Sequence, residues 1–208
     1  MNSPQGQHLF GVPVFQVVLE SFPENKDAIV RAISKYRQAS PGVAQSNIGG
    51  WHSASDLHKS SDSAFRTLFQ EIHRIAAGCI SRAQTGKRPI DLLIASAWVN
   101  VNPPGSWNAP HNHLPCEWSG VFYVEVPACA GDDTNINQAG ELALINPVQT
   151  SRYAGSSASV TIRAQEGLIV LFPSHLLHMV TPNMSTSERI SIAFNYVVRP
   201  SRQQPAES

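Results

Sequence analysis

The sequence predicts a mainly β protein: an antiparallel sandwich or barrel with two α-helices packed outside it. After Pro89, short runs of β-branched and aromatic residues alternate with turns rich in Gly, Pro and Asn. Several short strands separated by such turns are typical of antiparallel sandwiches and barrels. Before Pro89, two segments repeat apolar residues at helical spacing, and each such stripe needs another surface to pack on.

Length and composition indicate one globular domain covering residues 1–208. Of these residues, 42% are hydrophobic and only 14% are charged, which is typical of a chain that buries a core and excludes a disordered protein. The formal net charge is zero. The sequence therefore gives no signal for nucleic acid or an anionic membrane as a partner.

Cysteine usage and the N-terminal stretch predict a cytoplasmic location. Cys79, Cys116 and Cys129 form neither a disulfide framework nor a CxxC pair, and such a sparse, odd set fits a reducing compartment. The N-terminal stretch has no basic segment, and its apolar run is short and interrupted by Pro13. We therefore expect neither a signal peptide nor a membrane span.

Residues 1–88 are expected to form a strand and two helices that pack on the barrel. The strand is predicted at 12–20 and the helices at 23–40 and 61–86. The second helix has two candidate capping residues and one candidate end residue: Ser61, Ser63 and Gly86. The stretch 46–60, with its Gly-Gly pair and small polar residues, is predicted to be a loop.

Residues 89–199 are expected to form the strand-rich core of the sandwich or barrel, and residues 200–208 a loose tail. Composition predicts the strands of this core at 90–101, 118–127, 140–147, 159–174 and 188–200. The fourth of these stretches is predicted to contain two strands around a turn at 165–167.

A pair of histidines, His111 and His113 in "NAPHNH", precedes a β-branched and aromatic strand. In an extended segment, side chains two residues apart point to the same face, so both imidazoles reach one metal ion. Pro110 and Pro115 discourage a helix around them. Taken alone, the pattern is more often a polar loop than a ligand pair, and the metal hypothesis requires a third ligand on another strand.

The downstream stretch "EGLIVLFPSHLLHMV" offers that third ligand. Its buried strand ends at Phe172–Pro173 and is followed by His175 and His178. His178 precedes the apolar pair Met179–Val180, so we expect it on the next strand. The sequence therefore predicts a metal site formed by His111, His113 and His178.

In "ERISIAFN", the spacing of Arg189 and Ser191 suits an anion-binding site. Arg189 and Ser191 alternate with two isoleucines, so both polar side chains share one face of the strand. An arginine that faces into a barrel is costly to bury unless it meets an anion, and a guanidinium beside a hydroxyl suits a carboxylate. The alternatives are a salt bridge to an internal acid and an outward-facing position.

Together these residues fit an iron centre that binds a 2-oxo acid. Three protein ligands on one face of an iron leave three positions open. A 2-oxo acid chelates through two of them, while Arg189 holds its far carboxylate.

The same motifs resemble the double-stranded β-helix oxygenases that use Fe(II) and 2-oxoglutarate, most closely a bacterial and phage group within that superfamily. The resemblance covers residues 98–196 and rests on "NAPHNH", "SGVFYV", "LFPSHLLHMVTP" and "ERISIAFN". It implies a jelly-roll, cupin-like barrel with two flanking N-terminal helices, and an oxygenase, specifically a hydroxylase. By position, His111 and His178 correspond to the paired metal histidines, and Arg189 and Ser191 to the clamp on the distal carboxylate of 2-oxoglutarate.

One position departs from the pattern of that superfamily. His113 stands where its members usually have Asp or Glu, which leaves the iron without an anionic protein ligand. Glu117 is the alternative or additional ligand, although Pro115 leaves its phase on the strand open. We predict the three histidines as the ligand set.

A related pattern, that of the cupins, fits the same residues. The stretch from Gly105 to Glu117 matches G-x5-H-x-H-x3-E, and "GLIVLFPSHLLH" matches the partner motif except at His175, where glycine is expected. This resemblance implies a metalloenzyme that acts on a small molecule without 2-oxoglutarate. Its metal would be bound by three histidines and a glutamate. It accounts for His113, whereas the oxygenase resemblance accounts for Arg189 and Ser191 and is favoured. A non-catalytic metal- or ligand-binding barrel is the remaining alternative.

Further candidates surround these residues. Additional contacts to 2-oxoglutarate are expected from Asn100, Tyr123 and Asn195. Contacts to the substrate are expected from Trp51, Asn108 and His175. The sequence does not identify the substrate, and since barrels of this type often dimerise, a homodimer is one expectation.

Overall fold

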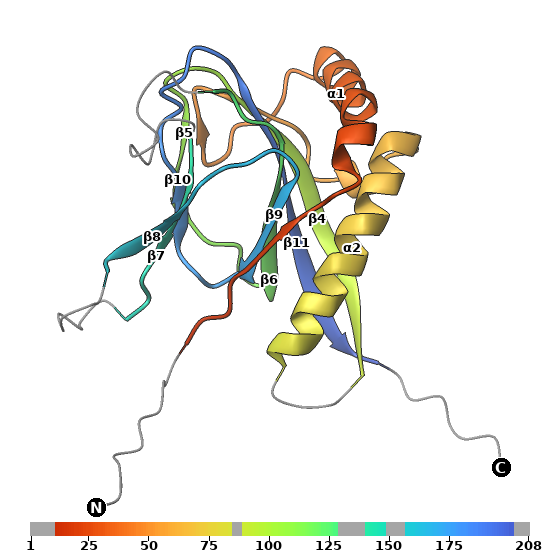
Figure 1. The fold of residues 1–208 in the computed structure, drawn as a ribbon, viewed down its shortest axis with the longest axis vertical. Helices are drawn as coiled ribbons and strands as arrows, with labels where there is room; N and C mark the ends of the chain where they lie inside the picture. Colours follow the sequence, from red (N-terminus) through yellow and green to blue (C-terminus); the bar gives the residue numbers. More distant parts are fainter. Residues whose placement is uncertain (1–10, 85–88, 129–139, 149–156, 202–208) are drawn as a thin grey trace, which may run out of the picture.

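Two antiparallel sheets, covered on one side by two helices, make up the protein (Figure 1). The computed structural model describes residues 11–84, 89–128, 140–148 and 157–201. Gly86, Cys129 and most of the predicted tail lie outside these ranges. The arrangement confirms the predicted mainly β class, a double-stranded β-helix with two flanking helices.

The larger sheet has six strands and the smaller sheet has five. In spatial order, the larger sheet contains β1 (Phe15–Val18), β9 (Leu168–Pro173), β6 (Trp118–Glu125), β11 (Arg189–Pro200), β4 (Ile90–Asn102) and β3 (Trp51–His52). The smaller contains β2 (Asn47–Ile48), β5 (Trp107–His111), β10 (His178–Val180), β7 (Leu142–Ile145) and β8 (Ser159–Ile162).

The two helices, α1 (Phe22–Gln38) and α2 (Ser63–Ala83), lie against the outer face of the larger sheet. The predicted caps of α2, Ser61 and Ser63, were wrong. Asp62 is the N-cap, and its carboxylate accepts a hydrogen bond of 2.9 Å from the Ala64 backbone N–H. An aspartate suits this position because it satisfies a free N–H and carries the charge that the helix N-terminus favours.

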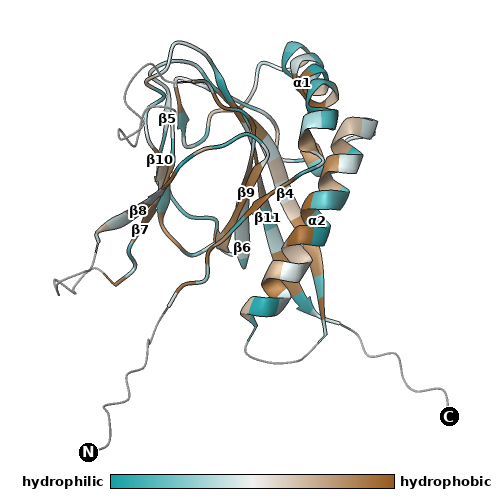
Figure 2. Ribbon diagram, viewed as in Figure 1, coloured by the Kyte–Doolittle hydropathy of each residue, from teal (hydrophilic) through white to brown (hydrophobic). Residues whose placement is uncertain are grey.

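Alternation along β11 divides the larger sheet into an apolar face and a polar face. Ile190, Ile192 and Phe194 belong to the core shared with the helices, and Figure 2 shows hydrophobic residues where α2 packs on β4 and β11. The alternate residues, beginning with Arg189 and Ser191, therefore face the space between the sheets. Both are buried, at 1% exposure.

The stretch 46–60, predicted to be a loop, contains β2, β3 and a short 3-10 helix, η1 (Leu57–Lys59). β2 pairs with β5 in the smaller sheet and β3 pairs with β4 in the larger one. The stretch therefore links the two sheets. The loop expectation was wrong because strands of two residues are too short to leave a period in the sequence.

The predicted turn at 165–167 separates strands of different sheets. β8 pairs with β7, whereas β9 lies between β1 and β6. At the turn, the Leu168 N–H donates to Gln165 O over 3.1 Å. The chain therefore crosses from the smaller sheet to the larger sheet at this turn.

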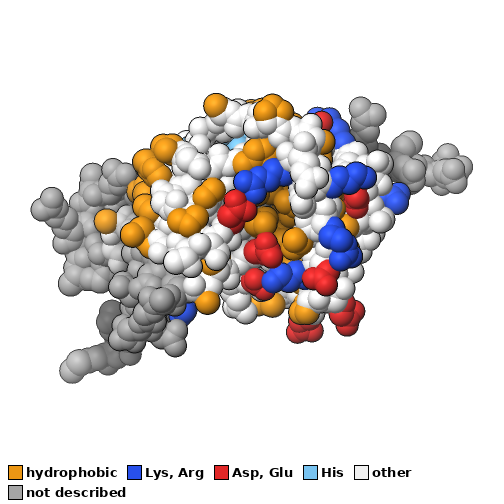
Figure 3. Space-filling view, turned by 90° about the horizontal axis from the view of Figure 1, so that it is seen from above, with side chains coloured by type: hydrophobic (Ala, Val, Ile, Leu, Met, Phe, Trp, Pro, Cys, Tyr) orange, Lys and Arg blue, Asp and Glu red, His pale blue; other side chains and the backbone are white. Residues whose placement is uncertain are grey.

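The surface carries charges of both signs. Figure 3 shows Lys and Arg side chains next to Asp and Glu side chains on the face that it presents. In the described ranges, no helix combines the length and the apolar composition needed to cross a membrane.

Candidate active site

The inner faces of the two sheets enclose a pocket that contains most of the predicted site residues. It is lined from the smaller sheet and the turn after β5 by His111, His113 and His178, and from the larger sheet by Tyr123, Arg189 and Ser191. Histidines and arginine thus approach one space from opposite walls.

The three histidines form a cluster with metal-binding geometry. His111 ends β5, His178 begins β10 directly opposite it, and His113 follows two residues after His111. Their ring centroids are 4.4–5.0 Å apart, and one potential ligand atom from each lies within 4.8 Å of the others. In the part of the chain that the structure describes, this is the single group of three or more candidate metal ligands found.

Backbone carbonyls fix the orientation of two of these rings. His111 Nδ1 lies 2.7 Å from Ala109 O, and His178 Nδ1 lies 2.9 Å from Leu176 O. A carbonyl only accepts, so each Nδ1 carries the proton and each neutral ring keeps its lone pair on Nε2. Metal-binding histidines are commonly held by such a bond to the other ring nitrogen.

Burial keeps the cluster neutral. It lowers the pKa of His113 to about 3, with His178, His111 and His52 as further contributions. Burial and then the neighbouring His111 lower the pKa of His178 to about 4, and burial also lowers the pKa of His111. At neutral pH all three rings are therefore uncharged, as a metal-binding imidazole must be.

Glu117, the alternative ligand, lies outside the cluster. After His113 the chain turns, with the Cys116 N–H donating to His113 O over 3.0 Å. Glu117 is exposed, and its Oε2 accepts a hydrogen bond of 3.0 Å from the Val198 N–H. The turn thus directs this carboxylate to the end of β11, and the structure brings together three histidines without it.

On the opposite wall, Arg189 places a buried guanidinium in the pocket. Its Nη1 donates to Gly140 O over 2.8 Å and its Nη2 donates to Asn102 Oδ1 over 3.2 Å. Its Nε has no hydrogen-bond partner among the described residues. Among the described residues no carboxylate forms an ion pair with Arg189, so neither the internal salt bridge nor the outward position considered from the sequence is present.

Tyr123 adds a second unpartnered donor beside the arginine. Its ring centroid lies 5.9 Å from Arg189 Cζ, and its hydroxyl, close to the Leu142 backbone, makes no well-formed hydrogen bond. Burial raises the pKa of Tyr123 to about 12, so the hydroxyl keeps its proton. A buried charge with two unsatisfied donors fits a carboxylate ligand.

Sheet register aligns further candidates with Ser191. Ser191 lies opposite Asn100 on β4 and opposite Tyr123 on β6, and cross-strand neighbours share a face. His52 extends this row, since it lies opposite Asn100 on β3. Asn108, a substrate candidate, is buried and also lines the pocket.

Three other candidates lie away from the pocket. The Asn195 side chain accepts from the Ser119 hydroxyl over 2.7 Å and donates to Ser96 over 3.0 Å. Trp51 packs against Tyr36, with ring centroids 6.5 Å apart, and His175 is exposed. None of the three lines the pocket.

Sequence reasoning missed an aromatic pair beside the metal cluster. Trp98 lies edge-on to His113, with centroids 5.4 Å apart, and stacks on His52 at 5.3 Å. Trp98 lies opposite Ala193, two residues from Ser191 on the polar face. The alternation used for Arg189 and Ser191, extended to the neighbouring strand, would have found it.

The family description "Putative 2OG-Fe(II) oxygenase" matches residues 96–195. This stretch contains the three histidines, Tyr123, Arg189 and Ser191. The chain is a 2OG-Fe(II) oxygenase. The oxygenase is therefore an oxidoreductase, and Fe(II) and 2-oxoglutarate are its cofactors. No curated protein matches the sequence.

Solved structures share the fold of this oxygenase at low sequence identity. A prolyl-4-hydroxylase from Pseudomonas putida is 14% identical, with a TM-score of 0.61 over 88% of this chain and 91% of the other. The carbocyclase SnoK from nogalamycin biosynthesis is 14% identical, with a TM-score of 0.63 over 88% and 78%. HygX from Streptomyces hygroscopicus, bound to nickel, 2-oxoglutarate and hygromycin B, is 11% identical, with a TM-score of 0.63 over 89% and 83%.

Proposed function

We propose that this oxygenase is a hydroxylase that holds iron with His111, His113 and His178 and holds 2-oxoglutarate with Arg189. The observation that carries the proposal is the pairing of two unlike groups in one pocket. Three neutral imidazoles stand on one wall, and a buried guanidinium with a free Nε stands on the other. A molecule with a chelating end and an anionic end matches this pair.

Bound iron and 2-oxoglutarate supply the oxidising chemistry, in which dioxygen and 2-oxoglutarate yield succinate and carbon dioxide while one oxygen atom enters a substrate C–H bond. The protein's own residues bind and orient. Arg189 offers its charge and a hydrogen bond from Nε–H to the distal carboxylate, and Tyr123 donates a hydrogen bond from its hydroxyl. Ser191 and Asn100, in the same row as Tyr123, are proposed to add polar contacts.

Apolar side chains exclude water around the histidines. Phe172 lies edge-on to His178, with ring centroids 4.9 Å apart, and Trp98 does the same for His113. Both residues line the pocket. Low water content strengthens the attraction between the arginine and an anion, because solvent screening is reduced.

The proposed ligand set contains no carboxylate. The cupin pattern needs Glu117 as a fourth ligand, and this residue is exposed and bonded to Val198. Three neutral ligands suffice to hold a divalent ion. The chelating carboxylate of 2-oxoglutarate would bring one negative charge to the iron, and its distal carboxylate would meet the charge of Arg189.

A cytoplasmic location, a homodimer and a single domain covering residues 1–208 are also proposed. The free thiols of Cys79 and Cys116 support the first of these, since unpaired cysteines suit a reducing compartment. The core shared by α1, α2 and the larger sheet supports the third.

Anaerobic titration with Fe(II) and 2-oxoglutarate tests the proposal. Chelation of iron by the 2-oxo acid is expected to produce a visible charge-transfer band, which Arg189→Ala weakens at equal ligand concentration. Glu117→Gln, which alters a carboxylate outside the cluster, serves as the control and should leave the band unchanged. Absence of the band in the wild-type protein with iron demonstrably bound would exclude the proposed function.

A further inference from the structure

The side-chain partner of the Arg189 guanidinium is an amide and not a carboxylate. Asn102 is buried at 1% exposure, and its Oδ1 accepts from Arg189 Nη2 over 3.2 Å. Register places the two residues directly opposite each other on β4 and β11. A buried arginine is most often paired with an acid, so the amide at this position is unusual.

The orientation of the Asn102 amide follows from its surroundings. Arginine has only donors, so the oxygen of the amide faces Arg189. Its nitrogen then faces two acceptors, Asn47 Oδ1 at 3.1 Å and Asn108 Oδ1 at 3.5 Å. Both ends of the amide are thus matched to their neighbours.

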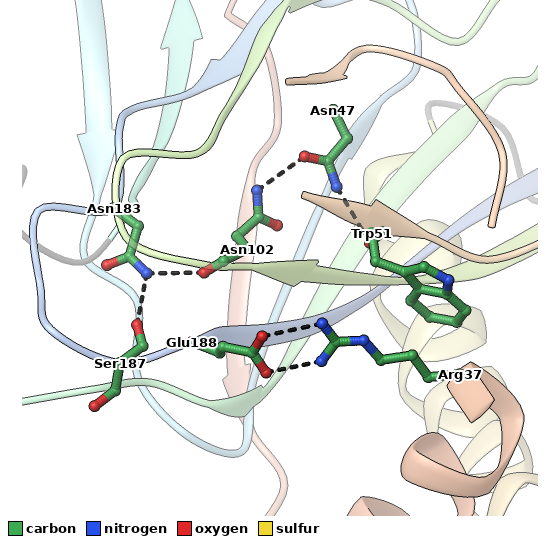
Figure 4. Close-up of polar contacts among 7 residues, drawn as sticks. All are labelled: Arg37, Asn47, Trp51, Asn102, Asn183, Ser187 and Glu188. Carbon is green, nitrogen blue, oxygen red and sulfur yellow. Dashed lines mark hydrogen bonds and ion pairs between the residues drawn. The ribbon is translucent and has the colours of Figure 1, made fainter. Parts of the chain in front are cut away.

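Long-range contacts hold Asn102 itself (Figure 4). The Asn183 amide donates to the Asn102 backbone carbonyl over 2.8 Å and to Ser187 O over 2.8 Å. Asn47 in turn donates to Trp51 O over 3.3 Å. The space beside Asn47 is tight, since a Cβ at Gly50 would come within 2.5 Å of its Oδ1. The amide network therefore has little freedom to move.

No carboxylate in the described part of the chain forms an ion pair with Arg189. Glu188, the preceding residue, forms an ion pair with Arg37 at 2.9 Å (Figure 4). The charge of Glu141 acts on Tyr123, whose pKa it raises. The second partner of the guanidinium, Gly140 O, is also neutral. Among the described residues, the guanidinium thus has neutral hydrogen-bond partners and no ion pair.

We propose that Asn102 is a positioning residue that fixes Arg189 for the distal carboxylate of 2-oxoglutarate while leaving its positive charge free. The inference rests on the proposed function and deepens it. An amide accepts one hydrogen bond from the guanidinium and so sets its direction. A carboxylate at the same place would set the direction equally well but would neutralise the cation and repel the ligand.

The test compares two 2-oxo acids on anaerobic, Fe(II)-loaded protein by calorimetric titration. Pyruvate has the chelating end of 2-oxoglutarate but lacks the distal carboxylate. We expect Asn102→Asp to weaken 2-oxoglutarate binding about 100-fold and Asn102→Ala about 10-fold. Pyruvate binding should change less than about twofold in both variants, since the metal end is untouched.

Asn47→Asp is the matched control. It introduces the same charge one side chain further from the guanidinium, because the hydrogen bonds of the Asn47 side chain join it to Trp51, Asn100 and Asn102. A loss below about threefold is expected because the effect of a charge falls with distance. If Asn102→Asp fails to fold, the comparison of Asn102→Ala on the two ligands decides the question.

The outcomes separate the inference from the function on which it rests. Unchanged 2-oxoglutarate affinity in the Asn102 variants, or equal losses for both ligands, would overturn the positioning role while the proposed function stands. If the wild-type protein binds 2-oxoglutarate no better than pyruvate, the anion clamp itself is wrong and both ideas fall.

Discussion

The histidine end of the pocket and its arginine end are held by different kinds of contact. His111 and His178 each bond to the carbonyl of the residue two positions earlier in the chain. Arg189 instead bonds to Gly140 and Asn102, which are 49 and 87 residues away. The metal end is thus oriented by local backbone, whereas the anion end depends on the complete fold.

This difference predicts which changes stay local. A ligand histidine can be lost without disturbing the network around Arg189, because the two ends share no hydrogen bond among those described. Substitutions in the amide network around Arg189 should affect several strands at once, since this network includes residues of β2, β4 and the turn before β11. The following predictions separate the two ends, from the largest expected effect to the smallest.

His178→Ala should strongly weaken metal binding at the histidine end. Two imidazoles remain of three, so we expect the affinity for Zn(II) or Co(II) to fall roughly 1000-fold. Competition with a chromophoric chelator measures this loss, and circular dichroism checks that the fold is retained. Wild-type affinity in this variant would remove His178 from the ligand set.

Arg189→Met should disable the arginine end alone. The substitution keeps an apolar stem in a site with 1% exposure and removes the charge. We expect 2-oxoglutarate affinity to fall about 100-fold, with metal affinity within about twofold of wild type. Calorimetry on the anaerobic Fe(II) protein checks both values, and a parallel loss of metal binding would show that the ends are coupled.

Stability of the metal-free protein should decline as the pH falls below about 6.5. The pKa values of His113 and His178 are lowered to about 3 and about 4, so the unfolded chain takes up protons at higher pH than the folded one. Between about pH 6.5 and 4, each histidine should lower the free energy of unfolding by up to about 1.4 kcal/mol per pH unit. Urea denaturation at several pH values measures the slope.

His113→Gln is the control for this slope. It removes one histidine whose pKa is lowered in the folded state, so the free energy of unfolding should depend less steeply on pH. An unchanged slope would mean that the histidine cluster does not cause it.

Glu117→Gln should have almost no effect on the histidine end. Its carboxylate accepts a hydrogen bond from the Val198 N–H, and a neutral amide oxygen preserves that bond. We expect metal affinity to change less than about twofold. A loss of metal affinity above about tenfold would indicate that Glu117 is a ligand and would contradict the three-histidine set.

Arg37→Ala should have the smallest effect at the arginine end. Its ion pair with Glu188 lies on the surface, with side chains 38% and 41% exposed. We expect the free energy of unfolding to fall by about 0.5 kcal/mol, with 2-oxoglutarate affinity unchanged. A marked loss of affinity would show that the ion pair, next to Arg189 in the chain, restrains the clamp.

Periodicity in the sequence predicted the elements that are long enough to carry it. Two helices and the strands around 90–101 and 188–200 have clear periods, and the alternation at Arg189 and Ser191 gave the polar face of β11. The family, the iron and the 2-oxoglutarate expected from the motifs are confirmed. Short strands such as β2 and β3 were missed because two residues show no period.

The sequence by itself determined residue types and local phase: two histidines two apart, a third before an apolar pair, and an arginine and a serine on one face of a strand. The tertiary structure decided which of them meet. A turn after His113 carries Glu117 away, hydrogen bonds to Ser96 and Ser119 occupy Asn195, and Asn102 becomes the partner of Arg189. The reason is that phase along a strand depends on neighbouring residues, whereas these partnerships join residues tens of positions apart, which only the packing of two sheets brings together.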